Sequence, residues 1–199
     1  MLVESVIFSI IIGFARKGRI SNLDRISLKY PYLFIVSVLL FGLVCSVAAS
    51  RGSLAMVRYA RMTNIIEYVG LLTAMLLNLN IREMWLAMAG TFMNFLAIVT
   101  NGGVMPMSPD ALRRAGMPEL MNPETVSHMV RHTLSTPETH LKALTDIIGI
   151  GSFSFLPDGI ASYLREVSSI GDVLVSLAAF MLIQRYMCNP PPEVKEKPA

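Results

Sequence analysis

The 199-residue chain is short of the residues that a soluble enzyme or a nucleic-acid-binding protein uses. Only 16% of its residues are charged, against roughly 25% in soluble domains, and tryptophan occurs once. Basic residues do not alternate with aromatic ones, and zinc-finger or helix-turn-helix spacing is missing, which argues against nucleic acid as a partner. A nucleophile elbow, a phosphate-binding loop and a Cys-x-x-Cys pair are missing as well. The sequence therefore favours a protein without catalytic activity.

Cysteine and histidine are also scarce. The two cysteines, Cys45 and Cys188, fall at different depths of two apolar segments, so we expect free thiols rather than a disulfide. The three histidines lie outside the apolar segments, which argues against haem held within a bilayer. No cofactor is predicted.

Long apolar segments are what the chain has in abundance. Hydrophobic residues make up 53% of it and gather in segments at about 2–15, 32–50, 62–79, 83–100 and 170–187. Most of these segments approach the ~20 residues that cross ~30 Å of hydrocarbon. The sequence therefore predicts an all-α integral membrane protein, a bundle of about five transmembrane helices in contact with membrane lipids. Residues 1–100 would hold four helices, residues 170–188 the last one, and residues 189–199, rich in proline and charge, a disordered tail.

Basic residues near the ends of the apolar segments predict the orientation in the membrane. On one side they are Arg16, Lys17, Arg19, Arg25, Lys29, Arg82, Arg185, Lys195 and Lys197. Because cytoplasmic loops carry an excess of lysine and arginine, this side is predicted to be cytoplasmic. The N-terminus and residues 101–169 would then lie outside, and the C-terminus inside.

Residues 101–169 form a polar stretch that we expect to lie outside the bilayer. It contains three similar tripeptides, Ser108-Pro109-Asp110, Asn122-Pro123-Glu124 and Thr136-Pro137-Glu138. Each offers an N-cap residue, a proline at the first helical position and an acid near the positive helix end. They predict short helices near 109–115, 123–134 and 137–147, the first closed by Gly116. Residues 147–156 are apolar but too short to span, and are predicted to lie in the interface or dip back into the bundle.

Three motifs resemble a known family. They are Asn101-Gly102-Gly103 with Met105-Pro106 and Ser108, then Arg131-His132 with Thr139, Leu141 and Asp146-Ile147, then Gly171-Asp172-Val173-Leu174 with Leu182-Ile183-Gln184-Arg185. In this order they resemble DUF5317, a family of small prokaryotic membrane proteins. The resemblance implies a helical bundle in a prokaryotic cell membrane and supplies no activity. The chain differs from the family pattern at Arg131, His140 and Thr145, where the family has lysine, arginine and glycine.

The first motif follows directly on an apolar segment. Glycine adopts a positive φ without strain, so Asn101, Gly102 and Gly103 form either a helix cap with a sharp turn or a backbone cup for a ligand or ion. Met105 and Pro106 belong to the same candidate site.

Ionisable and polar residues inside or beside apolar segments are candidates for function. Asp172 begins the last segment and either complements the helix dipole or serves a site, with Arg131 or Arg165 as its partner. Glu67 and Asn94 lie within two earlier segments, where they would either pair near the membrane surface or line a polar path.

Three histidines fall within thirteen residues of the polar stretch. His128 and His132 are four residues apart, a spacing that places both on one helix face and can chelate a metal. A third ligand would come from His140, Glu138 or Asp146. The alternative is a set of ordinary surface histidines.

These residues are compatible with three functions. The first is a non-catalytic membrane subunit, a scaffold or accessory component that binds other membrane proteins. The second is a small transporter or channel with a path near Glu67, Asn94 and Asp172. The third is a membrane enzyme in which Asp146, Asp172 and His132 act on an interfacial substrate, which requires these side chains to share one pocket.

Overall fold

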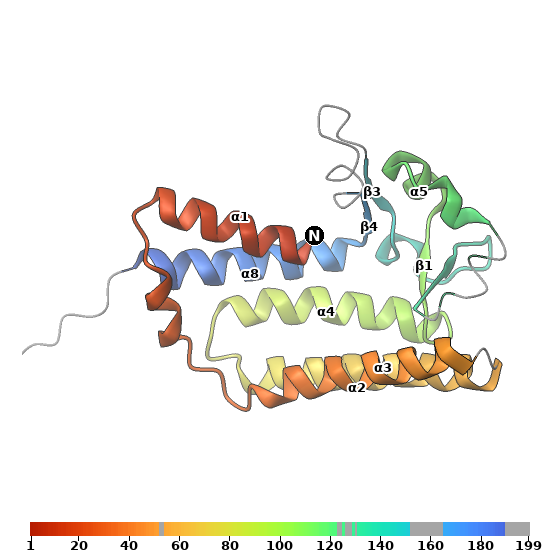
Figure 1. Cartoon of the computed structure of the whole chain (residues 1–199), viewed down its shortest axis with the longest axis horizontal. Coiled ribbons are helices and arrows are strands. Elements are labelled where there is room, and N and C mark those ends of the chain that lie inside the picture. Colours follow the sequence, from red (N-terminus) through yellow and green to blue (C-terminus); the bar gives the residue numbers. More distant parts are fainter. Residues whose placement is uncertain (52–53, 123–124, 126–128, 130, 152–164, 190–199) are drawn as a thin grey trace, which may run out of the picture.

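The computed structural model of the chain is mostly helical and describes residues 1–51, 54–122, 125, 129, 131–151 and 165–189. Its long helices run side by side, and the residues that follow α4 gather at one end of them (Figure 1). The long helices are α1 (Leu2–Ala15), α2 (Tyr32–Arg51), α3 (Leu54–Leu77), α4 (Glu83–Thr100) and α8 (Ile170–Cys188). Four of them coincide closely with predicted apolar segments, because long apolar runs without internal proline form helices that bury their faces against one another. α3 begins eight residues before the segment predicted at about 62–79.

The helices pack in the order α1, α8, α4, α3, α2, so that α8 lies between α1 and α4 although it is the last in sequence. Small residues bring α4 and α8 close together. A Cβ atom on Gly171 would lie 2.6 Å from Cγ of Asn94 and 2.5 Å from the carbonyl oxygen of Gly90. Glycine at this position lets the two backbones approach, as small residues do in membrane helix packing.

Two of the described helices, α4 and α8, are long and apolar enough to cross a membrane. Shorter apolar helices are α1 and the Tyr32–Val44 part of α2. Large apolar side chains are exposed on the helices, among them Phe8, Leu39, Ile66 and Phe92. The structure thus shows a largely helical chain with two candidate membrane-spanning helices.

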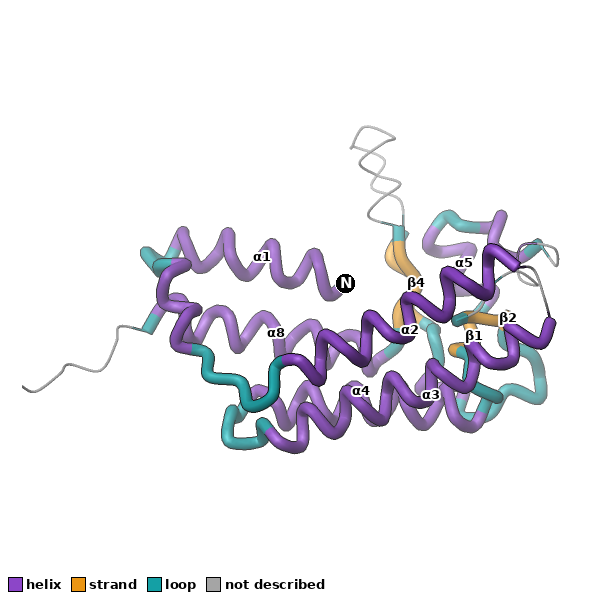
Figure 2. Tube along the Cα trace, turned by 60° about the horizontal axis from the view of Figure 1, so that its bottom comes forward, coloured by secondary structure: helices purple, strands orange, loops and turns teal. Residues whose placement is uncertain are grey.

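Residues 101–169 contain small sheets as well as short helices, which corrects the all-α prediction. β1 (Met105–Met107) pairs in parallel with β2 (His132–Leu134), and β3 (Ile148–Ile150) pairs antiparallel with β4 (Glu166–Ser168). The strands lie beside the ends of the long helices (Figure 2). The 3-10 helices are η1 (Ile20–Arg25), η2 (Pro118–Met121) and η3 (Lys142–Leu144).

One of the three predicted short helices is confirmed. α5 (Pro109–Ala115) has Pro109 at its start and is closed by Gly116 in the left-handed conformation, φ 71°. The prediction for 123–134 is wrong at its end, where β2 lies, and most of its remainder, with His128, falls outside the described residues. The prediction for 137–147 is wrong, since only η3 is helical there. At 132–134, pairing with β1 overrides the local helix propensity.

The apolar stretch 147–156 does not dip into the bundle where it is described. Ile148–Ile150 forms β3, and a Cβ atom on Gly149 would lie 2.9 Å from the carbonyl carbon of Ala111, so this strand packs against α5. Its pairing with β4 and its packing against α5 hold it in the polar region rather than in the bundle. Residues 152–156 and the predicted disordered tail from 190 onward lie outside the described residues.

Candidate functional site

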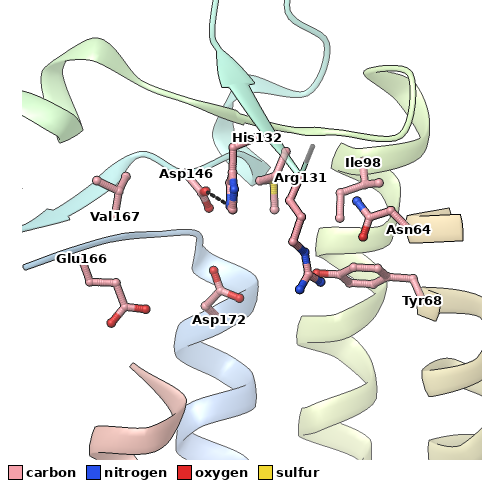
Figure 3. A pocket seen from close by; sticks show the side chains of 10 residues that line it. Asn64, Tyr68, Ile98, Arg131, His132, Asp146, Glu166, Val167 and Asp172 are labelled. Atoms are coloured by element: carbon pink, nitrogen blue, oxygen red, sulfur yellow. Dashed lines mark ion pairs between the residues drawn. The ribbon is translucent and has the colours of Figure 1, made fainter. Parts of the chain in front are cut away.

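A cavity of about 230 Å³ lies between the middle of α3, the end of α4, the start of α8 and the polar residues that follow α4 (Figure 3). Its wall is mostly polar and draws on α3, α4, β1, β2, β4 and α8 and on the loop positions of Arg131 and Asp146. The lining residues are Asn64, Tyr68, Ile98, Met105, Arg131, His132, Asp146, Glu166, Val167 and Asp172. Four of the predicted candidates, Met105, His132, Asp146 and Asp172, therefore meet in one place although 67 residues separate the first from the last.

The glycine turn after α4 attaches the polar region to α3. Gly102 and Gly103 have φ values of 72° and 86°, which reverse the chain at the helix end. A Cβ atom on Gly103 would lie 2.6 Å from the carbonyl oxygen of Arg61, and Asn64 Nδ2 donates to the Gly103 carbonyl at 2.9 Å. The structure thus places this turn against α3, beside the cavity rather than on its wall.

Asn101 fixes the next part of the same region. Its Nδ2 donates to the carbonyl of His140 at 3.0 Å, and its Oδ1 accepts from the backbone N–H of His140 at 3.0 Å. Its Nδ2 also donates to the Ala97 carbonyl at 2.7 Å, which caps the end of α4. Asn101 therefore holds the segment that leads to Asp146.

Strand β1 brings the ionisable residues together. The Met105 N–H donates to the carbonyl of Arg131 at 2.8 Å, so that β2 begins beside Met105. On the other side of the strand, the Asp146 N–H donates to the carbonyl of Pro106 at 3.0 Å. Arg131, His132 and Asp146 are thereby carried to one edge of the cavity by backbone hydrogen bonds to a three-residue strand.

His132 and Asp146 face each other at this edge, with 3.7 Å between His132 Nε2 and Asp146 Oδ2 (Figure 3). Asp146 is only 3% exposed. Burial, together with the negative charges of Asp172 and Glu166, raises the pKa of Asp146 to about 8. Burial and the positive charge of Arg131 lower the pKa of His132 below its usual value. Near neutral pH the pair is therefore uncharged, with the proton on the carboxyl group.

Asp172 is held in a fixed orientation at the start of α8. Its Oδ1 accepts from Asn94 Nδ2 at 2.8 Å, and its Oδ2 accepts from the Ser169 N–H at 2.9 Å. The Ser169 side chain accepts in turn from the Asp172 N–H at 3.0 Å, which completes a capping box. Of the two arginines expected beside Asp172, Arg165 instead donates to the carbonyl of Gly116 at 2.7 Å.

Glu67 and Asn94 lie behind the cavity wall rather than on it. Glu67 is 5% exposed and accepts from Arg131 Nη2 at 3.0 Å, which holds the guanidinium group at the cavity. Asn94 holds Asp172 in the same way. These two residues therefore position charged groups of the cavity.

All three family-like motifs contribute to this wall, with Met105 from the first, Arg131, His132 and Asp146 from the second, and Asp172 from the third. The model of the family described as "Family of unknown function (DUF5317)" matches residues 25–184, most of the chain. The chain belongs to DUF5317. No curated protein and no solved structure matches it.

Sequence reasoning missed several lining residues of this DUF5317 chain. Asn64 carried a usable signal, because it precedes Glu67 by three residues and so shares a helix face with it. Asn64 is 1% exposed, and its Oδ1 has no hydrogen-bond partner among the described residues. Tyr68 follows Glu67 directly and its ring points toward Arg131 (Figure 3). Glu166 carried no signal, because its position depends on the pairing of β3 with β4.

The predicted histidine site for a metal is only partly described in this DUF5317 chain. His132 lies on the cavity wall, while His140 is exposed and its backbone is held by Asn101. His128 falls outside the described residues. Within the described ranges, no three His, Cys, Asp or Glu side chains are arranged to hold a metal ion.

Proposed function

We propose that this protein is a non-catalytic membrane subunit that binds a small polar solute at the outer surface of a prokaryotic membrane. The observation that supports it is the polar cavity between the helix ends and the polar region. Its volume of about 230 Å³ is below the ~300 Å³ at which pockets for drug-sized ligands begin, so the solute would be small. Asn64 lines this cavity, and its buried Oδ1 has no hydrogen-bond partner in the part of the chain that the structure describes. Buried polar atoms are rarely left unpaired, so this oxygen favours a ligand that donates a hydrogen bond.

The membrane part of the proposal is a bundle of five spans. α4 and α8 meet the length and hydropathy needed, and α1, α2 and α3 expose large apolar side chains that suit contact with lipid. Basic residues around the link between α3 and α4 favour this end as cytoplasmic, with residues 101–169 outside. The partners are then membrane lipids and other membrane protein subunits.

Cysteine labelling tests the orientation. Cys45 and Cys188 are first replaced by alanine, and single cysteines are placed at two exposed positions, Glu138→Cys after α5 and Asn80→Cys between α3 and α4. A membrane-impermeant maleimide is expected to label the first in intact cells and the second only after permeabilisation. Labelling of both in intact cells would contradict the five-span arrangement, and the opposite pattern would reverse the orientation.

Native mass spectrometry of the protein released from its own membranes tests the binding role and the subunit role together. We expect a small bound mass on the wild type and stoichiometric partner chains. Val167→Trp places a large side chain on the cavity wall and is expected to remove the bound mass; Val3→Trp, on an exposed face of α1, is the matched control. A bound mass that persists in Val167→Trp would overturn the cavity as the binding site, and a lone monomer would overturn the subunit role.

An interfacial enzyme is the second candidate, because Asp146, His132 and Asp172 do line one cavity. The carboxyl group of Asp146 is protonated and lies 3.7 Å from the neutral imidazole of His132. Such a pair offers an acid and a base side by side, with pKa values shifted in opposite directions, which is an arrangement used in general acid–base catalysis. This candidate predicts that Asp146→Asn abolishes turnover of the bound solute without loss of binding. The subunit proposal predicts that wild type and variant both return the solute unchanged.

The transport hypothesis needs a path from the cavity to the opposite end of the helices. At that end Glu83 is buried in ion pairs with Arg82 and Arg185. Flux in liposomes decides it, because a transporter would move solute above the level of empty vesicles and lose that flux in Glu67→Gln.

A further inference from the structure

The charges around the cavity favour a positively charged occupant. Of the three carboxyl groups that line it, Asp146 is protonated near neutral pH. The charged groups on the wall are therefore the carboxylates of Glu166 and Asp172 and the guanidinium group of Arg131. The charge of Arg131 is offset by Glu67, whose carboxylate lies 3.0 Å away behind the wall. The terminal ammonium group of Met1 contacts Glu166. Among the described residues, Asp172 accepts hydrogen bonds from neutral donors only, Asn94 and Ser169. An anion entering here would meet the charge of Asp172 at short range, where repulsion is strong.

On the wall, Asn64 Oδ1 and the carboxylate of Asp172 are hydrogen-bond acceptors, so they favour an occupant that donates hydrogen bonds. Asn64 uses its Nδ2 to hold Gly103 and presents a buried Oδ1 that has no partner among the described residues. A carboxylate such as Asp172 accepts only, and has lone-pair positions beyond those that Asn94 and Ser169 occupy. In Figure 3 the carboxyl group of Asp172 points toward Asp146 and His132, across the space that these residues surround. An occupant with several N–H groups would satisfy this wall, whereas a cation without N–H groups would leave Asn64 unpaired.

A bare metal ion does not fit these residues. Hard cations take six or more oxygen ligands at about 2.0 to 2.6 Å, so their carboxylates must converge. Among the described residues no three acidic, histidine or cysteine side chains do so. A cavity of about 230 Å³ instead has room for an organic molecule of a few carbon atoms.

We propose that the cavity binds a small protonated primary amine, held by Asp172 and Glu166 and by Asn64 Oδ1. This inference rests on the proposed binding function and names its ligand class. The same ammonium chemistry is offered by a free amine in solution and by the ethanolamine headgroup of a phospholipid, because the cavity lies at the helix ends. Both sources present three N–H donors on one charged nitrogen.

Calorimetric titration of the purified full-length protein in lipid-free detergent tests the ligand class. Ethanolamine hydrochloride is the probe, and tetramethylammonium chloride, equally charged but without N–H groups, is the comparison at the same ionic strength. We expect saturable binding of ethanolamine and at least tenfold weaker binding of tetramethylammonium. Equal binding of the two, or no binding of ethanolamine, would overturn the proposal.

Matched acid-to-amide variants test the place of binding. Glu166→Gln and Asp172→Asn each remove one charge from the wall and keep the size of the side chain, and each is expected to weaken ethanolamine binding at least fivefold. Glu138→Gln removes an exposed acid elsewhere in the polar region and is expected to leave it unchanged. Because Asp172 also caps α8, the Glu166 variant decides the question if Asp172→Asn fails to fold. Equal affinity in wild type and Glu166→Gln would place the amine outside this cavity.

Lipid nanodiscs distinguish the two sources. If the headgroup is the source, discs with phosphatidylethanolamine are expected to weaken the apparent affinity for free ethanolamine at least fivefold relative to discs of phosphatidylcholine alone. If a soluble amine is the source, the affinity stays the same in both. The underlying binding function is tested separately, because a bound mass lost in Val167→Trp without any ethanolamine binding would uphold that function and overturn only the amine.

Discussion

The same kinds of polar residues occur at both ends of the helices, but they have different roles there. At the link end, which comprises residues 16–31, 78–85 and 184–189, Glu83 is 4% exposed and lies 3.0 Å from Arg185 and 3.3 Å from Arg82. Asn78 there accepts from the Lys29 N–H at 2.7 Å and donates to the Lys29 carbonyl at 2.9 Å. At the cavity end, formed by the lining residues and their neighbours, a buried glutamate and asparagine recur, but around a hollow.

The difference lies in how the polar groups are satisfied. Near the cavity end, Arg61 Nε, Asn64 Oδ1, Ser168 Oγ and Ser176 Oγ are buried without a hydrogen-bond partner among the described residues. The glutamate and asparagine of the link end have their partners within the protein. Since an unpaired buried polar group costs roughly 1 to 3 kcal/mol, the cavity end gives up stability that the link end retains. Of these four residues, only Asn64 lines the cavity, so it alone is placed to meet a ligand there.

The largest effect is expected from Asp146→Asn, and it is a gain in stability at high pH. In the folded protein the pKa of Asp146 is about 8, well above the value of an exposed carboxyl group, so between about pH 4 and pH 8 the folded state binds more protons than the unfolded state. Stability due to this group is complete below pH 4 and is lost as the pH rises to 8. Asparagine has no such proton, and the variant is expected to gain on the order of 4 kcal/mol over the wild type at pH 8.

Unfolding midpoints of both proteins between pH 4 and pH 9 measure this effect. Each midpoint is compared between wild type and variant at the same pH, because His132 contributes an opposite trend: its pKa is lowered by folding, so stability is lost as the pH falls below about 6.5. Curves that run parallel over the whole range would show that Asp146 is already ionised in the folded protein.

The next largest effect is expected at the link end, where a substitution should destabilise. Arg185→Gln removes the closer of the two arginines at Glu83 and leaves a buried carboxylate with Arg82 alone. Loss of one partner from a buried ion pair typically costs about 3 kcal/mol. The free energy of unfolding in detergent measures it, and ethanolamine binding should keep its wild-type affinity once the protein is folded. A loss of binding without a loss of stability would mean that the two ends are not separate in role.

The glycine turn at the cavity end offers a matched pair of smaller effects. Gly102 and Gly103 both have positive φ values, so alanine costs about 1 kcal/mol at either position. A Cβ atom at Gly102 would have no atom of the described residues within 4 Å, whereas at Gly103 it would lie 2.6 Å from the backbone of Arg61. Gly103→Ala is therefore expected to cost about 2 kcal/mol and Gly102→Ala about half of that. Equal effects in thermal unfolding would show that the turn does not press on α3.

The long helices and α5 were predictable because their signals are local. Apolar runs mark α4 and α8, and Pro109 and Gly116 mark the two ends of α5. The same proline signal failed at Thr136-Pro137-Glu138, because a helix start is maintained only if the following residues have a face to bury. Residues 132–134 form a strand because they pair with the backbone of Met105–Met107. This pairing is not encoded in any local sequence pattern.

The site was predictable in its charged residues and not in its geometry. Asp172 and Asp146 stood out because ionisable groups beside apolar segments are rare. Their convergence depends on β1, whose three residues were predicted only as part of a turn motif. Glu166 depends on a strand pair closed across a segment of fifteen residues, from Ile150 to Glu166. Such non-local pairing is set by the whole fold rather than by sequence near the residue.

The smallest effect is expected from an ion pair that belongs to neither end. Asp110 and Arg113 pair on α5 with side chains that are 70% and 58% exposed. Asp110→Asn is expected to change the free energy of unfolding by about 0.5 kcal/mol or less, because water screens an exposed pair and each long side chain loses freedom in forming it. Chemical denaturation of this variant beside Arg185→Gln compares the same arginine–carboxylate chemistry with and without burial. If Asp110→Asn and Arg185→Gln lost equal stability, burial of Glu83 would not explain the stability of the link end. The contrast between the two ends would then depend only on the unpaired polar groups near the cavity.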